Sequence, residues 1–261
     1  MSTTVLLVLL ALVLIRLPLA YLLTILLPDA AVSPVVHYVT TIGQSLLLFA
    51  LPGWLIGRRP ARLPLRRGNI CLWVLAALCL GAAAAVALKP LNRWWAELLA
   101  LQDSPIPAAS GGLEKLLQLL AYAVVPAVAE EMFFRGALLR SLRQERGSRA
   151  ALLIATLAFA LMHGSMAGLP GHLALSLLLT LLMLCTDRLI VPATAHLMYN
   201  VAVLSGLQAG ETAAWLCGAA LALGCLGMAA AARWEKRWKI PLHEGLLTGL
   251  ILAIMAAAYL I

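Results

Sequence analysis

The chain has 261 residues, of which 63% are hydrophobic and only 11% are charged, and its mean hydropathy is +0.98. This composition excludes a soluble globular domain, which needs a polar surface that so few charged residues do not supply. The formal net charge of +8 could suggest nucleic acid as a partner. However, the basic residues fall in short loops between apolar runs, as in membrane proteins, so no nucleic acid is expected.

Apolar runs of about 17 to 25 residues follow one another along the chain, which is the length of a helix that crosses a hydrocarbon core about 30 Å thick. The alternating pattern of a transmembrane barrel is missing. We therefore predict an all-α, polytopic transmembrane helical bundle that forms a single integral membrane domain over residues 1–261. About nine spans are expected, at 3–27, 35–56, 70–88, 113–139, 150–169, 172–186, 189–208, 212–232 and 245–261.

The loops between these spans differ strongly in charge. If the spans alternate in direction, fourteen of the 19 Lys and Arg residues fall on one side, and they lie in 57–68, in 140–149, at Arg188 and in 233–239. The opposite side receives Lys89, Arg93 and Lys115 together with the acidic residues Asp29, Glu97, Asp103, Glu114 and Glu211. Because positively charged loops stay in the cytoplasm, we predict a cytoplasmic N-terminus and a multi-pass protein of the bacterial inner membrane.

The segment between the third and fourth spans has its own pattern. Residues 91–101 form an amphipathic stretch that carries Trp94 and Trp95, and residues 103–112 are rich in Pro and Gly. This pattern predicts an interfacial helix followed by a loop.

Two adjacent acids, Glu130 and Glu131, lie well inside the span 113–139. A charged side chain at such a depth costs from about 2.5 to more than 10 kcal/mol, so an intramembrane acid indicates a functional site. Arg135 follows Glu131 by four residues, a spacing that favours an ion pair on one helix face.

Two histidines, His163 and His196, lie inside later spans. Phe159 precedes His163 by four residues and Asn200 follows His196 by four, so each pair shares a helix face. At about 1.5 Å per residue, Glu130, His163, His196 and Asn200 lie roughly 15, 21, 12 and 18 Å from the nearest cytoplasmic arginine. The polar residues of three helices therefore converge on one layer, where they could also serve only to hold the helices together. Two glutamates, two histidines and an asparagine nevertheless supply a base, proton carriers and an amide donor, which favours a functional site.

These motifs resemble those of the CPBP family of intramembrane proteases, which includes CAAX endopeptidases and bacterial Abi-type proteins. The family pattern is E-E-x-x-x-R, then F-x-x-x-H, then H-x-x-x-N, each on its own transmembrane helix. This chain has Glu130-Glu131 with Arg135, Phe159 with His163, and His196 with Asn200, in the same order and spacing. The resemblance covers residues 113–207, which we interpret as the catalytic core.

The resemblance implies an intramembrane endopeptidase, CAAX-type or peptide-processing, of the glutamic type. It implies that Glu130 is the base that activates water together with His163, and that His196 and Asn200 stabilise the oxyanion. Glu131, Arg135 and Phe159 are expected to support these catalytic residues. We expect a membrane-associated peptide or protein as substrate, the lipid bilayer as surroundings, and a cavity that opens toward the cytoplasm.

Three alternatives remain open from the sequence. Glu and His in the bilayer could form the relay of a proton-coupled transporter or channel, although the repeated halves with broken helices that many transporters contain are missing. A membrane scaffold of the same fold could carry the motifs without catalysis. Zinc could be bound by two histidines and a carboxylate, but H-E-x-x-H is absent and the five cysteines form no C-x-x-C pair, so no metal or other cofactor is expected.

Overall fold

The computed structural model describes residues 8, 11, 12, 15, 33–57, 69–102, 106–232 and 248. In this part of the chain every regular element is a helix, which confirms the predicted all-α class. The expected spans 3–27 and 245–261 lie outside the described residues except for isolated positions. The total of nine spans and the cytoplasmic N-terminus therefore stay predictions.

Two of the long helices contain π-helical segments, in which the backbone is wound more widely. The first consists of α2 (Pro34–Ser45), the π-helix η2 (Leu46–Ala50) and α3 (Leu51–Gly57). The second consists of α5 (Gly112–Leu119), η3 (Leu120–Val124), α6 (Val125–Glu131), η4 (Met132–Leu139) and α7 (Arg140–Arg146). The remaining helices are α4 (Ile70–Leu98), α8 (Ser148–Met162), α9 (Leu169–Thr186), α10 (Ile190–Leu204) and α11 (Glu211–Ala231).

Five helices of the described part are long and apolar enough to cross a membrane, and they cover Pro34–Gly57, Ile70–Leu98, Gly112–Arg146, Leu169–Thr186 and Glu211–Ala231. The other two, α8 and α10, have 15 residues each. All seven spans predicted between residues 35 and 232 thus correspond to helices, with two shorter than expected.

The prediction for the segment after residue 88 is wrong in one respect. We expected a span that ends at residue 88 and a separate interfacial helix over 91–101, but α4 continues through Pro90 to Leu98. Two contacts hold the helix beyond the proline: Asn92 Oδ1 accepts from the Gly171 N–H over 2.7 Å, and Trp95 Nε1 donates to the Met166 carbonyl over 3.0 Å. These tertiary bonds stabilise a continuous helix against the loss of one backbone hydrogen bond at Pro90.

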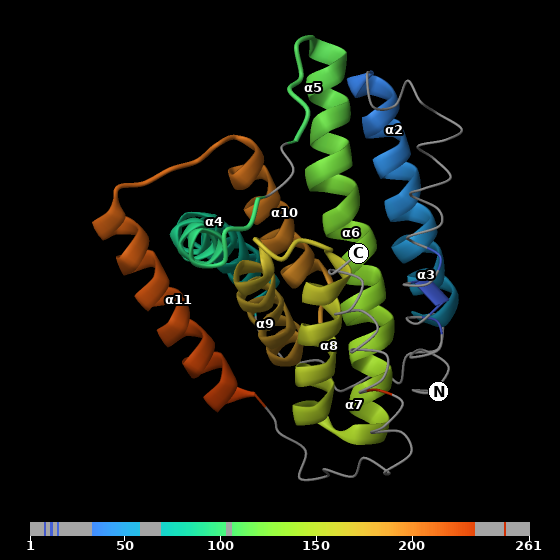
Figure 1. Ribbon diagram of the computed structural model, residues 1–261. Helices are drawn as coiled ribbons and strands as arrows, with labels where there is room; N and C mark the ends of the chain where they lie inside the picture. Colours follow the sequence, from blue (N-terminus) through green and yellow to red (C-terminus); the bar gives the residue numbers. More distant parts are fainter. Residues whose placement is uncertain are drawn as a thin grey trace.

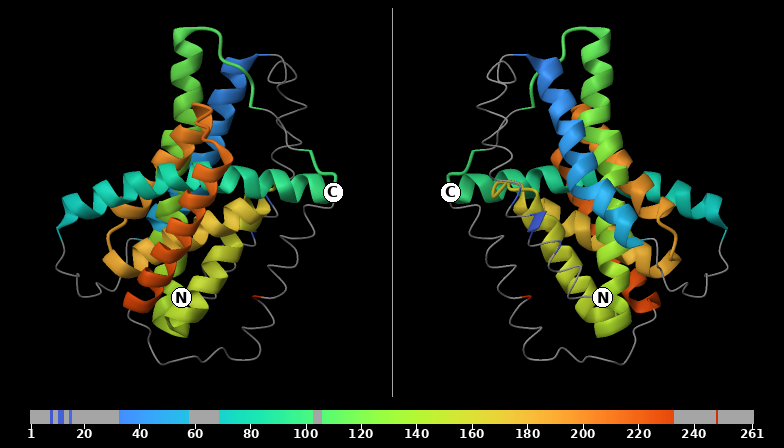
Figure 2. Two further views of the ribbon diagram at one scale, coloured as in Figure 1. Left: turned by 90° about the vertical axis from the view of Figure 1, so that its left-hand side faces the viewer. Right: turned by 90° about the vertical axis from the view of Figure 1, so that its right-hand side faces the viewer.

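The helices pack in two groups on opposite sides of the α5 to α7 rod, which comes from the middle of the chain (Figure 1). The α2 to α3 rod lies beside the α5 to α7 rod, and α8, α9 and α10 pack on the other side of the latter. Figure 2 shows α4 running across these helices, with α11 on its outer side. The chief neighbour of α4 is α10, which Gly81 lets approach so closely that a Cβ at position 81 would overlap the carbonyl oxygen of Ala195.

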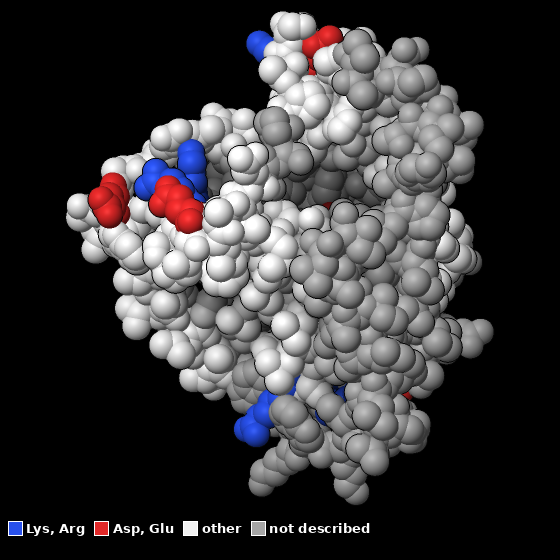
Figure 3. Space-filling model, viewed as in Figure 1, with Lys and Arg blue, Asp and Glu red and all other residues white. Residues whose placement is uncertain are grey.

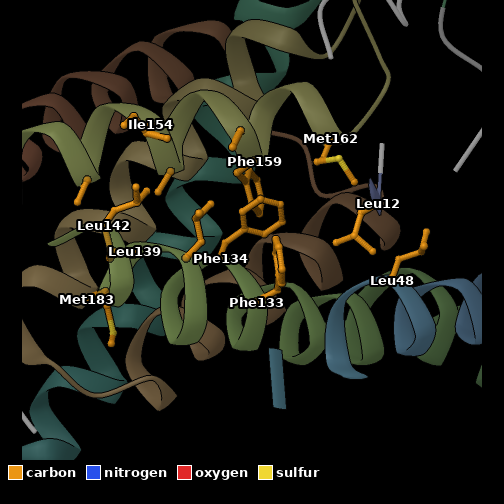
Figure 4. Packing of buried hydrophobic residues seen from close by; sticks show 14 residues of the cluster. Leu12, Leu48, Phe133, Phe134, Leu139, Leu142, Ile154, Phe159, Met162 and Met183 are labelled. Atoms are coloured by element: carbon orange, nitrogen blue, oxygen red, sulfur yellow. The ribbon is translucent and has the colours of Figure 1, made fainter. Parts of the chain in front are cut away.

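Two hydrophobic clusters form the core. One centres on η4, α7 and α8 and includes Phe133, Phe134, Leu139, Leu142 and Phe159, all fully buried or nearly so (Figure 4). The second joins α4, α9, α10 and α11, and it includes Ala84, Leu179 and Ala195. The polar residues of the predicted layer lie beside the first cluster.

Candidate active site

The carboxylate of Glu130 faces the imidazole of His163. Glu130 is the second last residue of α6, and its Oε2 lies 3.6 Å from Nε2 of His163, the residue that directly follows α8. The other ring nitrogen of His163, Nδ1, lies 2.8 Å from the carbonyl oxygen of Phe159. Because a carbonyl oxygen only accepts, Nδ1 carries a hydrogen, and Nε2 of the neutral ring is an acceptor that points toward Glu130.

Glu131 lies in a second buried group beside the first. Its Oε1 accepts from Nη1 of Arg135 over 2.8 Å and lies 3.1 Å from Nδ1 of His196. Arg135 also donates through Nη2 to the hydroxyl and carbonyl oxygens of Ser176 in α9, at 3.0 and 3.1 Å. Since the side chains of Glu131 and Arg135 are both fully buried, each charge depends on the other for compensation.

Phe159 separates and positions these two groups. The guanidinium carbon of Arg135 lies 4.4 Å from the centre of the Phe159 ring, a cation–π distance. The centres of the His163 and His196 rings lie 4.5 and 5.6 Å from the same ring. Phe159 therefore contacts three side chains of the site while its carbonyl oxygen fixes the tautomer of His163.

A cavity of about 430 Å³ brings the candidate catalytic residues together, and Glu130, His163, His196 and Asn200 all line it. Glu131, Arg135 and Phe159 lie behind its wall, among the buried side chains. The structure thus brings the seven sequence-predicted site residues into one region, with four at the cavity and three in support.

The cavity extends away from the arginines of α7 and α8. Along the α5 to α7 rod, the lining residues Ala121, Tyr122 and Pro126 precede Glu130 and only Phe134, one turn on, follows it. In α10 the lining continues beyond His196 to Leu204. Figure 3 shows a hollow in the half of the molecule nearer the start of α5, and blue Lys and Arg atoms appear at both ends of this view.

The first hydrophobic cluster fills the space between the site and the arginine end. The expected opening of the cavity toward the cytoplasm stays a prediction, as does the charge-based orientation that puts those arginines in the cytoplasm.

His172 is a cavity residue that sequence reasoning did not select. It lies in the first turns of α9, lines the cavity, and stacks on His163 with ring centres 4.1 Å apart and planes 27° apart. The sequence does contain a pattern that could have identified His172. It precedes Ser176 by four residues, and this spacing puts it on the helix face that binds Arg135.

Close backbone contact supports the carboxylates from α3. A Cβ at Gly53 would lie 2.9 Å from the carbonyl carbon of Met132 and the nitrogen of Phe133, so only glycine fits there. This contact falls where η4 begins, immediately after Glu131. Wide π-helical turns of this kind are rare and are often found at functional sites.

The fold and site define a polytopic helical membrane protein with a carboxylate and imidazole cluster in an internal cavity. Residues 112–202 match the model of a family described as Type II CAAX prenyl endopeptidase Rce1-like. The matched segment contains all seven site residues, so this part of the chain is similar to the Rce1-like family, in agreement with the resemblance of its motifs to the CPBP family. This similarity supports a CAAX-type protease with a membrane-associated protein substrate. No curated protein and no solved structure matches the chain.

Proposed function

We propose that this protein is an intramembrane endopeptidase of the glutamic type, in which Glu130 and His163 activate a water molecule. The observation that carries the proposal is the approach of Glu130 Oε2 to His163 Nε2 over 3.6 Å at the wall of a cavity. Both atoms are acceptors when Glu130 is ionised and His163 is neutral. A water between them donates one hydrogen to each and keeps its lone pairs directed at a bound carbonyl carbon.

In the reaction, the water oxygen bonds to the carbonyl carbon while its proton passes to Glu130. The carbon–nitrogen bond then breaks, and Glu130 returns the proton to the leaving amine nitrogen. The substrate oxygen becomes negative in between and needs hydrogen-bond donors. Asn200 offers its amide NH₂, and His196 offers Nε2–H.

Nδ1–H of His196 is bonded to Glu131. The ring can donate from Nε2 at the same time only if it is an imidazolium, with a hydrogen on both nitrogens. The Glu131 carboxylate 3.1 Å away stabilises that form.

Zinc is the alternative to this metal-free mechanism. In the described part of the chain, no group of three or more His, Cys, Asp and Glu side chains is arranged to hold a metal ion. Glu130 with His163 and Glu131 with His196 form two separate pairs, and this geometry favours direct activation of water by Glu130. Purified protein should therefore cleave after exhaustive chelation, and activity that is lost on chelation and restored by stoichiometric zinc would contradict the mechanism.

The activity itself is tested by comparing peptides from bacterial membranes that contain wild-type protein, Glu130→Gln or Glu97→Gln. The control residue Glu97 is highly exposed and outside the cavity. We expect new peptide termini with the wild type and with Glu97→Gln, and their loss with Glu130→Gln, in which the amide is no base. Equal termini with Glu130→Gln would exclude the proposed role, and no new termini in any sample would favour a scaffold.

A further inference from the structure

The direction in which the cavity extends determines which side of the membrane supplies its substrate. Successive helices run in opposite directions, yet on each of them the lining lies toward the same end of the bundle. Apart from Phe134, one turn after Glu130, it comprises residues before Glu130 in the α5 to α7 rod, residues at the start of α9, and residues after His196 in α10. That end contains the loop before α5, from which Ile106 joins the cavity wall.

The opposite end is closed by packing. Between the carboxylates and Arg143, one turn after another is buried: Phe134, Leu138 and Leu142 have no exposed surface. Across from them, α8 contributes Ala151, Ala155 and Ala158, which are equally buried. No cavity-lining residue comes from α7 or from the first turns of α8. The described residues therefore leave a peptide no path to Glu130 from the end that carries Arg140, Arg143, Arg146 and Arg149.

These arginines are part of the strong charge asymmetry of the sequence, which assigns their end to the cytoplasm. We propose that the cavity takes its peptide from the opposite, extracytoplasmic face of the membrane. The proposal rests on the proposed protease function and specifies the substrate as a segment of an exported or membrane-anchored protein at the outer surface.

The cavity wall also limits the chemistry of that segment. Among the described residues that line the cavity, Glu130 is the only Asp, Glu, Lys or Arg. Thr41, Gln44 and Tyr122 offer hydroxyl and amide groups to a peptide backbone, while Ile106 and Val203 are apolar. A charged side chain next to the cleaved bond would be buried without a partner, which costs several kcal/mol. The segment is therefore uncharged around the cleaved bond.

Cysteine labelling tests the direction without any need for catalysis. In a background with the five native cysteines replaced by alanine, single cysteines are placed by Ala108→Cys in the exposed loop before α5, Gln44→Cys at the cavity and Arg149→Cys at the exposed start of α8. Intact bacterial cells are treated with a membrane-impermeant maleimide, and a parallel sample is permeabilised first.

We expect positions 108 and 44 to react in intact cells and position 149 to react only after permeabilisation. Reaction at 149 with none at 108 would overturn the proposal, because the cavity would then face the cytoplasm. Reaction at 108 and never at 44 would also overturn it, because the cavity would lack a water path to that face.

The peptides lost with Glu130→Gln give an independent test of the substrate class. Their cut sites should lie in uncharged segments outside the cytoplasm, and cytoplasmic cut sites would overturn the proposal even if the protein is a protease. If no peptide changes, the protease function fails while the labelling result still decides the direction of the cavity.

Discussion

Nδ1 of His196 and Nη1 of Arg135 meet at one atom, Oε1 of Glu131, at distances of 3.1 and 2.8 Å. Glu131 thereby links the helix that carries both carboxylates to α10, and Arg135 extends the link to Ser176 in α9. The second acid of the motif is thus structural by its contacts, whereas the first faces the cavity.

Replacing Glu131 alone should destabilise the protein strongly. Glu131→Leu leaves the fully buried Arg135 without its counter-charge, and breaking such a pair costs about 3–5 kcal/mol. Adding Arg135→Met should recover much of the loss, because two apolar side chains need no compensation. The readout is the unfolding temperature in detergent, and a Glu131→Leu protein that unfolds like the wild type would contradict the buried-pair argument.

The tautomer of His163 leads to a second prediction. In His163→Asn the side-chain NH₂ can still donate to the Phe159 carbonyl, but no acceptor remains at the position of Nε2. The variant should fold normally and lose cleavage by about 10²–10⁴-fold, the usual contribution of a general base. Peptide cleavage and unfolding temperature are measured together, and near-normal cleavage would show that Nε2 does not act on the water.

Gly81 tests the contact between α4 and α10. Gly81→Ala places a methyl group on the carbonyl oxygen of Ala195, next to His196. We expect a loss of about 1–3 kcal/mol from overpacking and lower activity as His196 moves. Gly224→Ala in α11 is the matched control, since a Cβ there meets nothing within 4 Å, and it should be neutral or stabilise by up to about 1 kcal/mol. Equal behaviour of the two variants would contradict the close approach.

Asp187 gives a pH-dependent prediction. Partial burial raises the pKa of this carboxyl group above its ordinary value, although Arg140 and Arg143 oppose the shift. The folded protein therefore binds more protons than the unfolded chain between the ordinary pKa and the raised pKa. Stability falls as the pH rises through that window, and the penalty is complete above it.

Asp187→Asn should remove this slope, because the amide does not titrate. Asparagine also tolerates the left-handed backbone at this position, where φ is 50°. The check is the unfolding temperature in detergent from pH 3.5 to 7 for both proteins. A wild-type stability that rises with pH relative to the variant would mean that the ion pair with Arg140, at 3.6 Å, outweighs burial.

Much of this architecture could be predicted from the sequence because it depends on short-range rules. Apolar runs gave the helices between residues 34 and 231, and spacings of four placed Glu131 with Arg135 and Phe159 with His163 on common faces. The continuation of α4 past Pro90 could not be predicted, since it depends on bonds from Asn92 and Trp95 to residues more than 70 positions away.

The same reason applies to the shape of the cavity. Counting residues from the nearest arginine placed Glu130, His163 and His196 in one layer of the membrane. This count gives only a distance along each helix. Whether the space above or below that layer is filled depends on how Phe134, Leu138 and Ala155 pack against one another, and helical periodicity does not contain that information. His172 was missed similarly, because its stacking on His163 depends on how α9 starts.

The π-helical winding of Met132–Leu139 sets the direction in which the side chains before it point relative to α7. One residue of an α-helix corresponds to a rotation of about 100°, so removing a single residue there and restoring α-helical turns rotates everything before it relative to α7. Glu130 and Glu131 would then leave the sectors that face His163 and His196. The segment after the carboxylates is thus sensitive to insertion and deletion in a way that substitution scanning does not reveal, because the number of its residues sets the geometry of the candidate active site.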